Sequence, residues 1–319
     1  MKKRLLVSAL GIAIAMSFST CWAASKIDGK VTNKSTVKQA ANIAIGENNK
    51  ASMGSISMKG TNIGKTGVVT NTSDVKQAAN IAIGKGNTAS MGSINMQNTK
   101  IDGKLTNKST VKQAANIAIG ENNAANMGSV NIKGGSIGKT GVVSNTSDVK
   151  QAANIAIGKG NTANMGSINM QNAKIDGKLT NKSTVKQAAN IAIGENNAAN
   201  MGSVNMKGGS ISKTGVVSNT SDVKQAANIA IGKGNTANMG SINMQNSKVA
   251  GKVTNKSTVK QAANIAIGEN NTANMGTINL KNATIGKTGV LTNTSDVKQA
   301  ANIAIGKGNE ASMGSVQVE

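Results

Sequence analysis

The stretch VKQAANIAIG, first found at residues 37–46, decides how this chain folds, because the chain contains it eight times. Successive copies are spaced alternately by 38 and 36 residues, so that eight units form four pairs of 74 residues. The copies begin at Val37, Val75, Val111, Val149, Val185, Val223, Val259 and Val297. A repeat of this fidelity predicts a stack of equal units, each of which buries its apolar residues against its neighbours.

Alternation within the repeat favours β-strand over helix. Odd-numbered residues from Val37 to Ile45 would form one face of the strand, and even-numbered residues from Lys38 to Ala44 the other. We expect the isoleucines of the first face to be buried. Gly46 and Asn49 supply turn residues that tolerate positive φ. An array of helical repeats is the alternative, weakened by 37 glycines and by segments too short for paired helices.

Stacking one unit on an identical unit supplies cohesion. The layers would lie about 4.7–4.9 Å apart, and amide side chains would form ladders. Stacked lysines at Lys38 and its equivalents, with charges about 10 Å apart, would repel by roughly 0.4 kcal/mol in water. Burial of one Ile contributes about 1.5–3 kcal/mol, so burial should prevail. With their equivalents in the other units, the residues predicted to form the ladders and the core are Gln39, Asn42, Ile43, Ile45, Gly46, Asn49, Ala51, Met53, Gln77, Asn80, Ile81, Ile83, Gly84, Asn87, Ala89 and Met91.

The spacing leaves open whether one unit makes one wide coil or two narrow coils. The alternation of 36 and 38 residues predicts that paired units differ in the loop around Thr66, Gly67 and Val68. The last unit runs to Glu319 without a polar capping segment. An uncapped end is an open sheet edge, and it predicts a polymer rather than a lone solenoid.

Composition argues against an enzyme. The chain has no His, Tyr or Pro, and its single Phe, Trp and Cys are Phe18, Trp22 and Cys21. Carboxylates recur singly, whereas general acid–base catalysis needs a tuned and positioned group, often one of a pair. We therefore predict no catalytic residue, no metal site and no cofactor.

The chain is strongly basic, with 36 Lys and Arg against 13 acidic residues. Removal of residues 1–23, which hold three of the basic residues, would leave 33 against 13, a net charge of +20. Anionic polysaccharide, lipopolysaccharide and extracellular DNA are the non-specific partners that this charge favours. The alternative is that the lysines only keep a repetitive surface soluble.

Residues 1–23 read as an export signal, with Lys2, Lys3 and Arg4 before an apolar run and a cleavage site after Ala23. Residues 24–319 would then form one domain of eight repeats, secreted and without a transmembrane segment. Lipidation of Cys21 is the competing interpretation.

Two families of secreted amyloid resemble the repeat. Residues 84–89, with Gln77 upstream, resemble the G-x-G-N-x-A centre of the curlin repeats of curli. Residues 41–46 followed by Asn49 are similar to the N-x-x-x-G-x-x-N pattern of Fap-type repeats. These resemblances imply β-arch coils stacked into an extracellular fibre that supports biofilm and surface attachment. The unit is much longer than a curlin repeat and lacks the Gln that follows the Asn corner there.

Residues 80–89 also resemble the head repeats of trimeric autotransporter adhesins, which have shorter periods. We therefore predict an all-β solenoid of stacked β-arches that self-assembles as the subunit of an extracellular fibre. The alternative is a monomeric surface adhesin, or a solenoid that binds glycan or ice.

Overall fold

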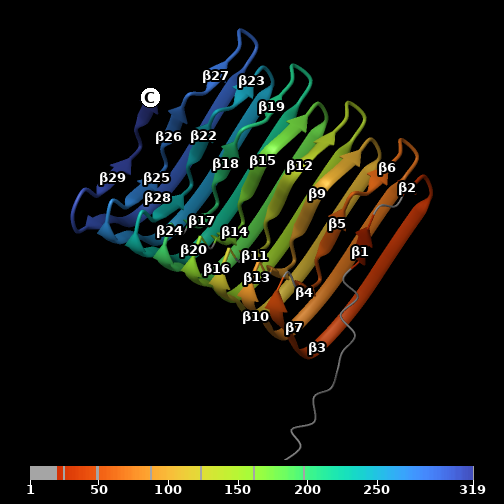
Figure 1. The fold of residues 1–319 in the computed structure, drawn as a ribbon, viewed down its shortest axis with the longest axis horizontal. Helices are drawn as coiled ribbons and strands as arrows, with labels where there is room; N and C mark the ends of the chain where they lie inside the picture. The colour runs from red at the N-terminus through yellow and green to blue at the C-terminus, as the bar shows by residue number, and fades with distance from the viewer. Residues whose placement is uncertain are drawn as a thin grey trace, which may run out of the picture.

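The computed structural model describes residues 20–23, 26–47, 50–86, 88–122, 124–160, 162–196 and 198–318. Over these ranges the chain forms thirty β-strands and no helix. All strand pairs are parallel, and the strands stack into a β-solenoid along which the chain advances unit by unit (Figure 1). The predicted all-β solenoid is confirmed, and the helical-repeat alternative is wrong.

Three sheets form the walls of the solenoid. Sheet B consists of eight long strands: β3(Lys30–Glu47), β7(Val68–Lys85), β10(Lys104–Glu121), β13(Val142–Lys159), β16(Lys178–Glu195), β20(Val216–Lys233), β24(Lys252–Glu269) and β28(Val290–Ile305). Sheet C consists of eight short ones: β4(Lys50–Met53), β8(Thr88–Met91), β11(Ala124–Met127), β14(Thr162–Met165), β17(Ala198–Met201), β21(Thr236–Met239), β25(Thr272–Met275) and β29(Glu310–Met313).

Sheet A contains the remaining strands of the described ranges. They are β1(Thr20–Ala23), β2(Lys26–Ile27), β5(Ile56–Lys59), β6(Asn62–Ile63), β9(Ile94–Ile101), β12(Val130–Ile137), β15(Ile168–Ile175), β18(Val204–Lys207), β19(Ser210–Ile211), β22(Ile242–Gln245), β23(Lys248–Val249), β26(Ile278–Lys281), β27(Thr284–Ile285) and β30(Val316–Val318). Each coil therefore runs from a sheet B strand through a sheet C strand to sheet A, and returns to sheet B in the next unit.

Each repeat forms one wide coil, which answers the question that the spacing left open. Val37 pairs with Val75, and Val75 pairs with Val111, so equivalent residues of successive units lie one above the other. The difference of two residues between units lies in the connection from sheet A to sheet B. Residues 64–67 make this connection in one type of unit and residues 102–103 in the other. Thr66 Oγ1 donates a hydrogen bond to the carbonyl oxygen of Asp28 one coil below, at 2.8 Å, and fixes the longer loop.

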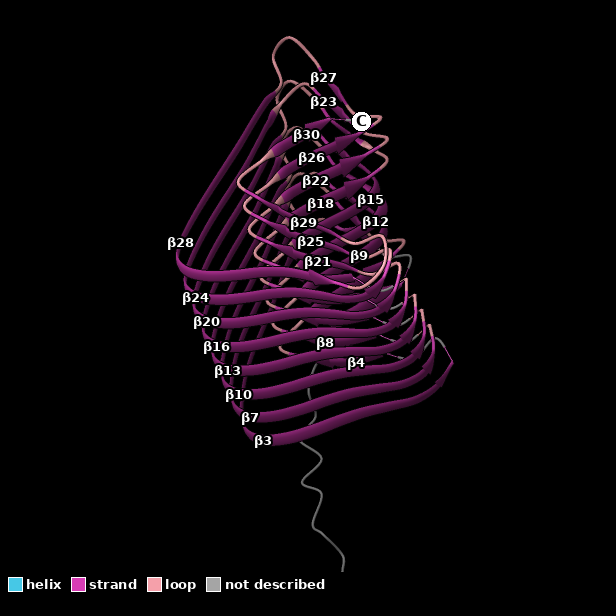
Figure 2. Cartoon of the chain, turned by 90° about the vertical axis from the view of Figure 1, so that its left-hand side faces the viewer, coloured by secondary structure: helices cyan, strands magenta, loops and turns pink. Residues whose placement is uncertain are grey.

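The long strands bend at a corner, and this bend corrects the predicted orientation of the isoleucines. In β7 the inward residues before the corner are odd-numbered, up to Val75, and those after it are even-numbered, Asn80 and Ala82. The change of phase falls between Val75 and Asn80. Lys76 lies in this segment, is exposed, and has no partner in the pairing of β7 with β10. Figure 2 shows the corner where the labels of β28, β24 and β20 stand. Unbroken alternation from Val37 to Ile45 was therefore wrong.

Ile43, Ile45, Ile81 and Ile83 face outward and do not form the core. Exposure is 56% for Ile43, 70% for Ile45 and 37% for Ile83, whereas Asn80 and Ala82 are fully buried. The reason is the narrow gap between the second half of the long strand and sheet C. The Asn80 side chain spans this gap by donating to the carbonyl oxygens of Ala51 and Ser90, at 2.9 and 3.0 Å. A gap one Asn side chain wide accommodates Ala and Asn but not Ile.

The apolar core lies in the wider part of each coil. Ile56, Met58 and Ile63 of sheet A pack against Val69 of sheet B, and the same cluster continues through the later units. A second cluster near the corner contains the valines at Val75 and its equivalents and the methionines at Met53 and Met91. The core is therefore a set of continuous columns of Ile, Val, Leu and Met, each filled by one residue per unit.

Candidate functional site

The Asn80 column forms an amide ladder inside the solenoid. Each side chain donates from Nδ2 to Oδ1 of its equivalent in the next unit, at 2.8–2.9 Å. The members that are completely buried are Asn80, Asn116, Asn154, Asn190, Asn228 and Asn264. Each ladder bond stabilises the stack by about 0.5–1.5 kcal/mol, and loss of one partner costs more because a buried amide would remain unsatisfied.

Other predicted ladder residues lie at the turns. Gly46 and Gly84 have φ values of 118° and 126°. In the equivalent Gly232, a Cβ atom would lie 1.9 Å from the carbonyl oxygen of Gly194 in the coil below. Only glycine allows this approach at a positive φ. Asn235, an equivalent of Asn49, donates from Nδ2 to that same Gly194 oxygen at 2.9 Å and thereby ties two turns together.

Ala51, Met53, Ala89 and Met91 have at most 1% of their surface exposed. The side chains of Gln39, Gln77 and Asn42, and the whole of Asn49 and Asn87, lie outside the part of the chain that the structure describes.

The structure adds an interior ladder that sequence reasoning missed. Asn33 donates to Asn71 at 2.7 Å, and the same bond continues at 2.7–2.9 Å through each unit to Asn293. The signal was present in the sequence, because an Asn stands four residues before every copy of VKQAANIAIG. Thr, Lys and Ser surround this Asn, however, and such a polar cluster is equally typical of a solvent-exposed edge.

Ion pairs link the units in a fixed order. Lys85 Nζ lies 3.9 Å from Glu121 Oε2, and the pairs Lys159–Glu195 and Lys233–Glu269 repeat this contact at 3.6 and 3.9 Å. In each pair the lysine belongs to an even unit and the glutamate to the following odd unit. Because the side chains are 58–66% exposed, each pair contributes only about 0.2–1 kcal/mol. Their alternation nevertheless distinguishes one end of the solenoid from the other.

The two ends present sheet edges. In the described chain, β3 and β28 are the outer strands of sheet B, and β4 and β29 those of sheet C. Sheet A ends in β27 and β30 on one side and in β1 and β2 on the other. β1 pairs with β5 from Thr20↔Ile56 to Ala23↔Lys59, where a preceding coil would place its own strand. Residues 1–19 of the expected export signal lie outside the described residues.

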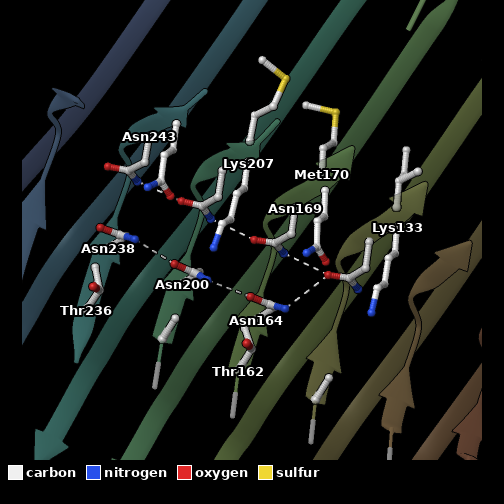
Figure 3. A pocket seen from close by; sticks show the side chains of 18 of the residues that line it. Lys133, Thr162, Asn164, Asn169, Met170, Asn200, Lys207, Thr236, Asn238 and Asn243 are labelled. Carbon is white, nitrogen blue, oxygen red and sulfur yellow. Dashed lines mark hydrogen bonds between the residues drawn. The ribbon is translucent and has the colours of Figure 1, made fainter. Parts of the chain in front are cut away.

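A groove runs along the outside, lined by residues of sheets A and C (Figure 3). Its volume is about 1060 Å³. Two amide columns form its floor: Asn164 donates to Asn126 at 2.8 Å and, in sheet A, to Asn131 at 3.2 Å. Both columns continue upward, as Asn200 bonds to Asn164 and Asn205 to Asn169.

Lysines and glutamines line the sheet A wall of the groove. Lys133 and Lys207 are exposed on either side of Gln171, so the positive charges recur every second coil, about 10 Å apart. Glu310 lies at the last coil, where hydrogen bonds from Ser312 and Gln317 lower the pKa of its carboxyl. At the other end of the solenoid, a hydrogen bond and ion pair with Asp28 raise the pKa of Lys26.

Comparison with family models, with curated proteins and with solved structures found no match. In the described part of the chain, no helix has the length and apolar character needed to cross a bilayer.

Proposed function

We propose that this chain is the structural subunit of an extracellular fibre that supports biofilm or surface attachment. Subunits add end to end, so that the first coil of one copy continues the parallel sheets of the last coil of another. The coils have the same cross-section throughout, because equivalent residues pair in every unit. Addition of a copy converts two sets of edge strands into paired strands.

The observation that carries this proposal is the complementarity of the two ends. The first unit is odd and carries Glu47, and the last is even and carries Lys307. In the described chain these two residues form no ion pair, although each is equivalent to a member of the Lys85–Glu121 type of pair. A second copy stacked in the same direction places Lys307 beside Glu47 and continues the alternation of units. Stacking in the opposite direction would bring like ends together.

The expected export signal fits this scheme. β1 covers the edge of β5, and cleavage after Ala23 would remove β1. The mature chain would therefore expose an edge that the precursor covers, which would restrict end-to-end growth to the exported protein. After cleavage the chain would contain no aromatic residue, because Phe18 and Trp22 lie in residues 1–23. Growth would therefore rely on backbone pairing and on the Asn columns.

Charge reversal at the ends tests the proposal. We expect Lys307→Glu to raise the critical concentration for fibre growth roughly 5-fold, since it replaces attraction with repulsion worth about 1 kcal/mol. Combining Lys307→Glu with Glu47→Lys should restore growth. Lys139→Glu changes the net charge equally on an exposed loop and serves as the control.

Growth is followed by sedimentation of fibres of residues 24–319 and by fibre diffraction, where a reflection at about 4.7–4.8 Å is expected. A wild-type chain that stays monomeric at every concentration would refute the fibre. Equal growth of the single and double charge variants would refute the assigned end contact.

The groove favours a second candidate function, a solenoid adhesin that binds a linear anionic glycan. Amides offer both donors and acceptors to hydroxyl groups, and Lys133, Lys207 and Lys281 supply positive charge along one wall. Saturable binding of an acidic polysaccharide to a stable monomer would favour this function over the fibre. Binding along a preformed fibre would be compatible with both.

A further inference from the structure

The second half of every long strand presents isoleucine to the outside of the solenoid. The isoleucine face comprises the outward Ile pairs of sheet B, from Ile43 and Ile45 in β3 to Ile303 and Ile305 in β28. Ile119, in an inner unit, is still 36% exposed although units above and below cover its sides. In β7, β10, β13, β16, β20 and β24 the alanine between the two isoleucines is buried, so no charged residue interrupts the face there.

The face is large for a surface left in water. Eight strands about 4.8 Å apart give a height of about 38 Å, and four residues of strand give a width of about 13 Å. Each copy therefore offers roughly 500 Å² of mainly apolar surface, in the upper half of the range of about 300–600 Å² for the largest apolar patch on a typical monomer. Two such faces in contact would bury roughly 1000 Å², the lower limit for a specific interface.

We propose that the isoleucine face binds the isoleucine face of a second copy of this chain, so that two solenoids lie side by side. The periodicity identifies this occupant. Rows of Ile that recur at the spacing of β-strands fit best between rows of the same spacing, and only a second solenoid offers such rows along the full height. Interdigitated branched side chains between two parallel sheets form a dry interface of the steric-zipper type.

Charge at the borders of the face determines the relative direction of the two copies. One border is the column of exposed lysines at the corner, represented by Lys76 in β7 and Lys112 in β10. The opposite border alternates acidic and basic residues, such as Glu121 and Lys159, at the strand ends. With parallel solenoid axes, the lysine column of each copy faces the mixed border of the other. Antiparallel axes would place lysine column against lysine column, which repels along its length.

This pairing is independent of growth at the ends. It uses the side of the solenoid, whereas the fibre proposed above grows through β3, β28 and the other edge strands. Together, the two contacts would give a fibre two solenoids wide, in which both solenoids have the same polarity.

The test substitutes Ile119 and Ile157 together by lysine in the mature chain. Both side chains point outward in central units, so the coil should still form. If Ile→Lys impairs folding, judged by far-ultraviolet circular dichroism, the Ile119→Ser, Ile157→Ser variant replaces it. The matched control is Thr110→Lys, Thr146→Lys, which adds the same charge to the outward face of the first half of the same strands.

Sedimentation velocity of freshly refolded protein and fibre width by electron microscopy are measured. We expect dimers and double-width fibres from the wild type and the threonine control, and at least 10-fold weaker dimerisation and single-width fibres from the isoleucine variant. Equal dimerisation or equal width would overturn the proposal. So would a monomeric wild type that binds phosphatidylglycerol vesicles through these isoleucines, because the occupant would then be a bilayer. Dimers without fibres would refute end-to-end growth alone, and single-width wild-type fibres would refute the lateral contact alone.

Discussion

Substitution of Asn154 by aspartate probes the Asn80 ladder at one of its most connected members. Asn154 is fully buried and donates to Asn190 Oδ1 at 2.8 Å and to the carbonyl oxygens of Ala125 and Asn164, each at 3.0 Å. It also accepts a hydrogen bond from Asn116 Nδ2 at 2.8 Å. Asn154→Asp removes the donor and directs a carboxylate oxygen at three acceptors, with almost no change in volume.

The cost can be worked out from these contacts. A buried acceptor that loses its donor costs about 1–3 kcal/mol, and an uncompensated buried charge costs about 3–5 kcal/mol. We expect Asn154→Asp to destabilise the central coils by about 3–5 kcal/mol near neutral pH. Burial and the facing carbonyl oxygens should raise the pKa of the introduced carboxyl above the unfolded value of about 3.9. The loss should therefore be smallest below that pH, where both states are protonated, and grow as the pH rises towards the folded pKa.

Urea denaturation followed by circular dichroism, from about pH 3 to pH 8, measures this loss, and hydrogen exchange locates it along the stack. The control is Asn196→Asp, the same substitution at an exposed turn residue with φ of 53°, where little change is expected. Equal midpoints for the two variants near neutral pH would refute the ladder as a source of cohesion. A loss that does not depend on pH would refute its assignment to buried charge.

Two further substitutions test the turns and the groove. Gly232→Ala should destabilise the stack by about 2 kcal/mol or more, because its Cβ atom would lie 1.9 Å from a backbone oxygen at φ of 129°. The control Gly29→Ala, with no atom within 4 Å of its Cβ, should be nearly neutral. Thermal melts of the two variants measure the difference. If the groove binds acidic polysaccharide, the double variant Lys133→Gln, Lys207→Gln should bind it several-fold more weakly, with an affinity that depends less on salt concentration. Calorimetry measures the affinity, and the control is Lys65→Gln, Lys139→Gln, which removes the same charge from exposed loops. Unchanged affinity would place the ligand elsewhere.

The sequence alone determined the architecture. Eight copies of VKQAANIAIG with Gly and Asn at fixed positions allow a stack of equal coils, because like side chains meet only when units lie in register. The loop of variable length at residues 64–67 follows from the alternating spacing. The spacing did not decide between one wide coil and two narrow coils, and only the structure shows that Val37 pairs with Val75. The members of the Asn80 column bond from unit to unit for the same reason.

Tertiary structure decided which side of the strand became the interior. A corner at Lys76 changes the phase of alternation, and nothing in the local sequence marks it, because Lys, Gln and Ala are compatible with a straight strand. The approach of sheet C to the second half of the long strand leaves space for Ala82 and Asn80 but not for Ile81 and Ile83. Hydrophobicity therefore predicted the wrong face. The gap is bounded by a strand from another part of the coil and is too narrow for Ile, so the available space, and not the preference of Ile for burial, decided which residues face inward.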